Sequence, residues 1–506
     1  MNNLRIKFAA AFALSILPTG CMVGPKYHAP APLPASAAAP PVSYKESPTQ
    51  FKETDGWKVA QPQDAMLRGK WWEIYNDPEL NALEDQLNIN NQNIKEFFEN
   101  FMEARTLIAE ARSELYPTVG VALSYQGAQT SANLTNSSNA NTGKKSSIGS
   151  LPFSATWEPD LWGKVRNLIH EQQYNAQLSE ADLENEKLTE QASLASFFFE
   201  LRGQDALEKV LNDTADADQK ALDLTTARYE TGVDQMISVV EARNTLQNVQ
   251  SQAINLGVAR AQFEHAIAVL VGANPSQFSI PVKPLLAVPP PIPVGVPSAL
   301  LERRPDIASA ERKMAAANAQ IGIAYAAYYP TLSISASYGQ QSSNFNHFFT
   351  FPSRYWSVGP TLSETIYDGG LRRATVNQFI TTYNADVASY RQTVLTAFQQ
   401  VEDDLASVRI LSQQIIMQQA ATDSAQEFVT LETDRYRLGL DQYINVVQAQ
   451  TTLLSDQQTL ASLHIQQIMD SVQLIEALGG GWDRTQLPTP ADVSKKLDKS
   501  DVVIQQ

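Results

Sequence analysis

The side chains that could catalyse a reaction are few in this chain of 506 residues, and they are scattered. The sequence contains no nucleophile elbow, no Walker phosphate-binding loop and no zinc-ligand spacing. Its eight methionines are dispersed, which gives no support to a thioether copper relay. We therefore predict no catalytic residues, no metal site and no cofactor, with an enzyme as the main alternative from another class. The isolated histidines are His28, His170, His265, His347 and His464.

The single cysteine, Cys21, is placed for covalent modification, because no second cysteine is available for an intramolecular disulfide. Basic residues followed by an apolar run from Phe8 to Leu17 are typical of a signal peptide, here residues 1–20. The site resembles that of a bacterial lipoprotein, in which the thiol receives diacylglycerol and becomes the mature N-terminus. It departs from the usual pattern, since Pro18 stands where such sites carry leucine. An ordinary signal peptide with an incidental cysteine is the alternative.

Two segments carry charged and aromatic residues in the same order, Arg-Tyr-x-x-Gly-x-Asp. Glycine permits a tight turn. Arginine and aspartate can form ion pairs between neighbouring helices and hold such a turn shut, although the same charges also occur on solvated helix ends. These candidate functional residues are Arg228, Tyr229, Gly232, Asp234, Arg435, Tyr436, Gly439 and Asp441.

The composition excludes one class of partner and indicates an ordered protein. A net charge of −16 argues against nucleic acid, because binding to phosphates depends on lysine and arginine. Hydrophobic residues make up 43% of the chain and charged residues 18%, so a large core can form.

The chain consists of two copies of one unit. Residues 228–240 align with residues 435–447, and eight of the thirteen pairs are identical. We predict that an extended N-terminal segment, lipidated at its start, covers residues 21–72. The first repeat then covers residues 73–280, a proline-rich connector 281–297, the second repeat 298–482 and a C-terminal tail 483–506. The Pro, Asp and Lys content of residues 485–506 predicts a loose tail.

Each repeat contains a strand pair with a long loop, near residues 117–158 and 330–367. The segments Thr118–Tyr125 and Thr331–Tyr338 alternate between apolar residues and small or polar ones, and a similar strand returns in each repeat. One apolar face and one small polar face are typical of a membrane β-barrel wall. A soluble sandwich is the alternative on this pattern alone.

Long helices follow each strand pair. Residues 164–228 contain no proline and one glycine, and residues 371–438 contain neither. An unbroken helix of this length would extend about 100 Å. A turn at Gly232 or Gly439 then starts a second helix that returns, so the Arg-Tyr-x-x-Gly motif lies at a hairpin tip far from the strands.

Four strands cannot form a stable membrane wall, because an open sheet leaves backbone groups unpaired at its edges. Membrane barrels begin at about eight strands. Two chains would supply eight strands and three would supply twelve, so the argument excludes a monomer without choosing between these assemblies.

An ordered set of motifs resembles the TolC-like outer-membrane efflux family, in particular its OprM-type (NodT) lipoprotein branch. The likeness covers most of the chain. The motifs are Cys21–Tyr27, Trp71-Trp72, Asp77–Leu80, Glu103–Arg105, Trp157–Gly163, Arg303–Ile307, Asp368–Gly370 and Leu478–Trp482.

The resemblance implies a homotrimer with a twelve-stranded outer-membrane β-barrel that is continued by an α-helical barrel across the periplasm. It also implies contact with outer-membrane lipid, a periplasmic adaptor protein and an inner-membrane transporter, commonly of the resistance-nodulation-division class. In this family the two tips form the periplasmic aperture and the surface that the adaptor grips.

One departure from the family concerns charge just past the tip. TolC-like gates often carry acidic residues there, whereas this chain has Asn445 and Gln448 in the second repeat. Glu241 occupies the place in the first repeat that matches Gln448. Strong attraction of cations at the gate is therefore not expected, unless Glu241 supplies the charge.

We interpret the chain as a passive exit duct for drugs or other small molecules, whose open state is selected by partners that bind the tips. Protein secretion of type I and metal export are alternatives within the channel class. A periplasmic coiled-coil scaffold is the alternative from another class, but it leaves the alternating strands unexplained.

Overall fold

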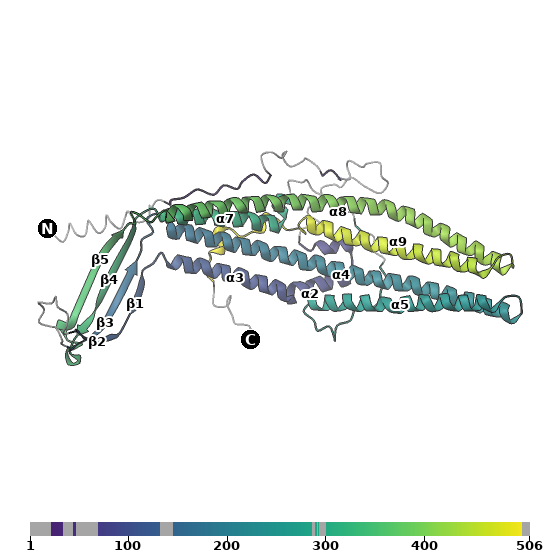
Figure 1. The fold of residues 1–506 in the computed structure, drawn as a ribbon, viewed down its shortest axis with the longest axis horizontal. Coiled ribbons are helices and arrows are strands. Elements are labelled where there is room, and N and C mark those ends of the chain that lie inside the picture. The colour runs from purple at the N-terminus through teal and green to yellow at the C-terminus, as the bar shows by residue number, and fades with distance from the viewer. Residues whose placement is uncertain are drawn as a thin grey trace.

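The protein is elongated, with a small β-sheet at one end and long helices that extend away from it (Figure 1). The predicted signal peptide and Cys21 lie outside the residues that the structure describes, as do the last nine residues of the tail. The computed structural model describes residues 22–33, 44–46, 69–131, 145–285, 289–290, 292 and 300–497.

The strands form one antiparallel sheet in which the hairpins of the two repeats lie side by side. The first two strands both pair with β3 in a single register, so they are two parts of one outgoing strand. The described chain therefore has the four strand positions expected from the sequence. The strands are β1 (Thr118–Val121), β2 (Ser124–Gln129), β3 (Lys145–Trp157), β4 (Thr331–Ser342) and β5 (Arg354–Ser363).

The register sorts the side chains of the sheet into apolar and polar rows. Paired residues share a face of a sheet, and successive residues alternate between faces. One row across all four strand positions is apolar: Val121, Phe153, Tyr338 and Trp356. The adjacent row, on the opposite face, contains only small residues: Gly120, Ser154, Ser337 and Ser357. Trp356 is 73% exposed, so the apolar face has no cover within one chain.

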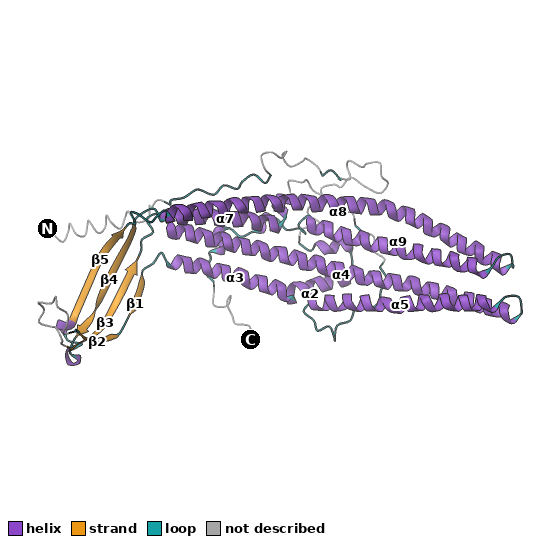
Figure 2. Ribbon diagram, in the orientation of Figure 1, coloured by secondary structure: helices purple, strands orange, loops and turns teal. Residues whose placement is uncertain are grey.

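Four helices run from the sheet side by side, in the order α3, α4, α7 and α8 (Figure 2). Two of them have 67 residues each, which corresponds to about 100 Å. None of the helices in the described part of the chain is both long enough and apolar enough to cross a membrane. The bounds are α3 (Gln92–Ser113), α4 (Lys164–Glu230), α7 (Pro305–Ala326) and α8 (Leu371–Arg437).

Two further helices return from the far end, α5 (Met236–Leu270) along α4 and α9 (Tyr443–Ala477) along α8. They end near the middle of the molecule, where a buried cluster with Trp71, Phe198 and Phe199 joins them to α4. The short elements of the described chain are η3 (Trp71–Tyr75), α2 (Pro78–Asn90), α6 (Leu300–Arg303), η5 (Phe345–His347), η6 (Phe351–Ser353), η7 (Arg484–Gln486) and α10 (Pro490–Val493).

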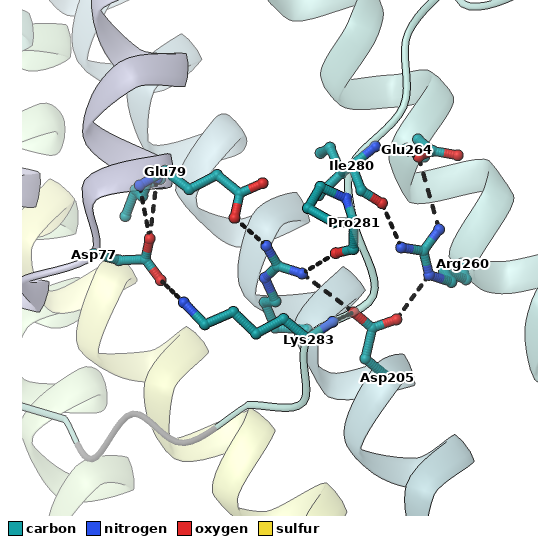
Figure 3. Close-up of polar contacts among 10 residues, drawn as sticks. Asp77, Glu79, Asp205, Arg260, Glu264, Ile280, Pro281 and Lys283 are labelled. Carbon is teal, nitrogen blue, oxygen red and sulfur yellow. Dashed lines mark hydrogen bonds and ion pairs between the residues drawn. The ribbon is translucent and has the colours of Figure 1, made fainter.

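A network of charged groups fixes this middle region (Figure 3). Arg202 on α4 is 2% exposed and pairs with Glu79 at the start of α2. The Asp205 carboxylate accepts hydrogen bonds from Arg202 at 3.3 Å, from Arg260 Nε of α5 at 2.7 Å and from the backbone N–H of Lys283 at 2.8 Å. Because its partners come from separate segments, Asp205 ties α4, α5 and the chain after α5 together.

The prediction of a loose C-terminal tail is wrong for residues 485–497. Gln177 of α4 donates to the carbonyl of Pro488 at 2.7 Å, and Gln173 donates to Ser494 Oγ at 2.8 Å. Val493 is 2% exposed against the helices. Polar side chains on α4 thus supply partners for this segment, which the composition of the tail does not indicate.

A glycine turn after α9 tests the packing of this region. Gly479 has φ +92°, and a Cβ there would lie 2.1 Å from the carbonyl oxygen of Arg303. Gly479→Ala is therefore expected to lower the free energy of unfolding by about 2 kcal/mol or more. The measurement is thermal unfolding of the detergent-solubilised protein, followed by circular dichroism.

The control is Gly257→Ala on the exposed face of α5, where nothing lies within 4 Å of the added Cβ. This change should stabilise the protein by about 0.5–1 kcal/mol, because alanine favours a helix. Equal effects of the two substitutions would contradict the packing described here.

Candidate functional site at the helical tips

The Arg-Tyr-x-x-Gly motifs form the two turns farthest from the sheet, one between α4 and α5 and one between α8 and α9 (Figure 1). Gly232 has φ +73° and Gly439 has φ +74°, a conformation that side chains disfavour. The turns close in the same way: Val233 N–H donates to the carbonyl of Arg228 at 2.9 Å, as does Leu440 N–H to that of Arg435. The structure therefore brings both motifs into equivalent turns.

An ion pair spans the turn of each hairpin, from the end of the outgoing helix to an aspartate two residues before the returning helix. Arg228 Nε lies 3.7 Å from Asp234 Oδ2, and Arg435 Nη2 lies 3.0 Å from Asp441 Oδ2. Each aspartate also accepts a hydrogen bond from the next backbone N–H, at 2.7 Å for Asp234 and 2.8 Å for Asp441. Each aspartate thus binds both the arginine across its turn and the backbone at the start of the returning helix.

Tyr436 and Arg228 link the two hairpins, and the repeats differ in the role of the tyrosine. The Tyr436 hydroxyl donates to Asp234 Oδ2, and the Tyr436 ring lies 4.6 Å from the guanidinium of Arg228. Arg228 also donates to the carbonyl of Arg437 at 3.1 Å. Tyr436 is 2% exposed, whereas its counterpart Tyr229 is 44% exposed. The sequence predicts both tyrosines as site residues but does not distinguish the buried one.

The electrostatics of this link favour an ionised Asp234. Burial raises the pKa of its carboxyl, but hydrogen bonds from Tyr436, the Gln235 backbone and Ser238, together with the charge of Arg228, outweigh burial and lower the pKa below its usual value. Burial and then the Asp234 carboxylate raise the pKa of Tyr436. The contribution of Asp234 to stability is therefore complete above the usual carboxyl pKa and is lost as the pH falls through the lowered value.

The residues past the tips are only partly joined to this network. Asn445 donates to the Asp441 carboxylate. Glu241 on α5 is half-buried and Gln448 on α9 is exposed, and both lie outside the ion pairs. Gln448 instead lines a surface pocket of about 590 Å³ on α9.

A buried carboxyl on α4 lies behind the tips, and sequence reasoning missed it. Asp218 is 2% exposed, and neither of its carboxylate oxygens has a hydrogen-bond partner among the described residues. Burial raises its pKa to about 6. Burial, and then the charges of Asp218 and Glu241, raise the pKa of Tyr443 on α9. Tyr443 packs beside Tyr436, with ring centroids 5.3 Å apart. Burial of one aspartate among several on a long helix leaves no signal in a single sequence.

Two repeats, four strand positions at one end and helical hairpins at the other define the TolC-like fold of outer-membrane channel subunits. The family described as outer membrane efflux protein matches residues 83–273 and 296–480. The antibiotic efflux pump outer membrane protein ArpC of Pseudomonas putida is 29% identical over 465 residues, which cover 92% of this chain and 93% of ArpC.

Two further relatives agree. The pyoverdine export outer membrane protein OpmQ of Pseudomonas aeruginosa is 27% identical over 478 residues, covering 93% of this chain and 97% of OpmQ. The structure of the outer-membrane channel OprN superimposes with a TM-score of 0.80 at 24% identity, covering 91% of this chain and all of OprN. The chain belongs to the outer membrane efflux protein family. It is the outer-membrane channel of an efflux pump, it extends into the periplasm and it is not an enzyme.

Removal of the hydroxyl that links the hairpins should loosen the tips. A hydrogen bond to a charged group contributes about 1.5–3 kcal/mol, so Tyr436→Phe is expected to raise amide hydrogen exchange at the tips about tenfold. Hydrogen exchange with mass spectrometry measures this in residues 228–235 and 435–442. Tyr229→Phe in the matching position is the control and should leave exchange unchanged; an equal effect of both changes would contradict the asymmetry.

Replacement of the buried Asp218 by asparagine should stabilise the protein at pH 7.5. Above the raised pKa of about 6 the wild-type carboxyl is ionised without a partner. The largest gain that this shift allows is about 3 kcal/mol. At pH 4 the carboxyl holds its proton in the folded chain and is about half protonated in the unfolded chain, so the gain should fall to well under about 1 kcal/mol.

The measurement is the midpoint of thermal unfolding for wild type and Asp218→Asn at pH 7.5 and pH 4. Asp216→Asn, an exposed change on the same helix, serves as the control and should show no difference between the two pH values. A gain from Asp218→Asn that is equal at both pH values would refute the role of ionisation.

Proposed function

We propose that three copies of this chain close their sheets into one twelve-stranded barrel and their helices into one tube, which serves as a passive exit duct. The observation that carries the proposal is the sheet. Its apolar rows face outward without cover, and its edge strands β1, β2 and β5 have no outer partner in the described chain. Lipid tolerates the apolar rows only if neighbouring chains pair those edges.

The tips are the aperture of this duct in the proposal. The Arg228–Asp234 and Arg435–Asp441 pairs close each hairpin, and Tyr436 holds the two hairpins together. A periplasmic adaptor that binds these tips would favour the open arrangement. An inner-membrane transporter of the resistance-nodulation-division class would supply the energy, because the duct itself carries no chemistry.

Cys21 carries the lipid anchor in this proposal, although it lies outside the described residues. The residues that follow it lie where the helices meet the sheet: Val23 N–H donates to the carbonyl of Trp162 at 3.0 Å, and Asn167 donates to the carbonyl of Val23 at 3.1 Å. A diacylglycerol group two residues before Val23 would therefore be within reach of the membrane that surrounds the strands.

The cargo in this proposal is small organic molecules. ArpC is named for antibiotics and OpmQ for pyoverdine, so related channels serve dissimilar small compounds. Protein secretion and metal export are the alternatives within the channel class. A scaffold without a pore is the alternative outside it.

Single-channel conductance in planar bilayers tests the duct and its aperture together. The wild type is expected to form a low-conductance pore, because the tips are closed. The double variant Asp234→Ala with Asp441→Ala should conduct several-fold more, since it removes both tip ion pairs. A folded oligomer that forms no pore in either form would defeat the duct and favour a scaffold.

The matched control removes two carboxylates on the helices that lead to the tips, Asp213→Ala on α4 with Asp423→Ala on α8. Asp213 is 66% exposed and pairs only with Lys209, and Asp423 is likewise exposed. This variant should conduct as the wild type does. Equal conductance of the two double variants would attribute any change to net charge and overturn the assignment of the tips.

A further inference from the structure

A second pocket in the described part of the chain lies far from the tips, close to the sheet. It has a volume of about 690 Å³ and lies between the start of the described chain and the sheet-proximal parts of α7 and α8. Its walls include Ile321 and Tyr325 of α7 and Ile380 of α8. This volume falls within the range of small-molecule sites in proteins.

The pocket is preformed, because the N-terminal segment is fixed on α7. Asn318 donates to the carbonyl of Pro25 at 3.0 Å. Gly24 approaches α7 so closely that a Cβ on it would lie 2.5 Å from the Cα of Gly322. Three residues further, the Tyr27 hydroxyl donates to the Glu311 carboxylate at 2.7 Å. These contacts hold one wall of the pocket against the other.

The pocket lies where the sheet begins. Tyr329 lines the pocket and stands two residues before Thr331, the first residue of β4. Its ring stacks on Trp162 at 4.8 Å, and Trp162 Nε1 donates to the carbonyl of Pro330 at 2.8 Å. Aromatic side chains with a polar group are typical of the boundary between membrane and water.

The charged side chain among the described residues that line the pocket is cationic. It is Lys26; His28 also lines the pocket, and no carboxylate does so among the described residues. The nearby carboxylate of Glu311 is occupied by Arg312 and by Arg484 at 3.0 Å. Lys26 makes no ion pair with the described part of the chain. An apolar pocket with a cationic rim is complementary to a molecule that carries both an acyl chain and a phosphate.

We propose that this pocket binds one glycerophospholipid from the periplasmic leaflet of the outer membrane. An acyl chain lies against Ile321, Tyr325 and Ile380, and the phosphate lies near Lys26 and His28. The inference rests on the proposed placement of the strands in the membrane. Bound lipid would then fix the N-terminal segment to α7 and α8 at the membrane surface.

Native mass spectrometry of the purified full-length oligomer tests the site, with palmitoyl-oleoyl phosphatidylglycerol added as the probe. The wild type is expected to retain about one lipid per chain. Lys26→Glu reverses the charge at the rim and Ile380→Trp fills the pocket, so each should lower retention at least fivefold. Lys164→Glu, an exposed change at the same end of α4, is the control and should retain lipid as the wild type does.

The proposal is overturned if both pocket variants retain as much lipid as the wild type. In a second experiment, photoreactive benzoylphenylalanine in place of Tyr325 identifies the occupant of the pocket in cells. A cross-linked glycerophospholipid supports the site, whereas cross-linking to the N-terminal peptide with its own covalent lipid overturns it.

Conductance separates this inference from the proposed function. Lys26→Glu and Ile380→Trp should form pores like those of the wild type, because neither residue belongs to the tips. Normal pores with unchanged lipid retention would remove only the lipid site. An absence of pores in the wild type would remove the proposed function instead.

Discussion

The pairing of backbone groups at the edges of the sheet is the constraint on which the rest of the molecule depends. The apolar row from Val121 to Trp356 needs a surrounding hydrocarbon, yet hydrocarbon cannot satisfy the free N–H and C=O groups of an edge strand. In the proposed barrel, strands from neighbouring chains would meet both requirements. Assembly would therefore accompany membrane insertion in that barrel. The strands would also set the positions of the four helices next to the sheet, because α3 and α7 lead into β1 and β4 and because α4 and α8 follow β3 and β5.

The tips are the part of the chain that this constraint leaves least fixed. The Tyr436 hydroxyl links the hairpins through Asp234, alongside the hydrogen bond from Arg228 to the carbonyl of Arg437, and a hydrogen bond to a charged group contributes about 1.5–3 kcal/mol. A partner needs only a comparable difference in affinity between two tip arrangements to shift their populations. The two copies of the motif differ in this respect, because the tyrosine of the second copy, Tyr436, is buried whereas Tyr229 of the first copy faces outward.

Features with a local period could be predicted from the sequence, and contacts between distant segments could not. Strict alternation from Thr331 to Tyr338 and the long runs without proline indicate the strands and helices, and the repeated glycines indicate the tip turns. The same residues do not reveal that Tyr436 is buried, that Gln177 holds the tail, or that Asp218 lacks a partner. Each of these depends on packing between elements that the period of a single segment does not encode.

The distribution of buried charge explains why motion would concentrate at one end. In the middle of the molecule Asp205 accepts hydrogen bonds from two arginines and a backbone amide, so its burial is compensated. Toward the tips, Asp218 is buried to a similar degree, but its carboxylate accepts no hydrogen bond from the described residues. An uncompensated carboxyl lowers the cost of separating α4 from its neighbours, since separation returns it to water. In the proposed duct, opening of the hairpins would therefore be easiest beyond the Asp205 network, which joins α4, α5 and the chain after α5.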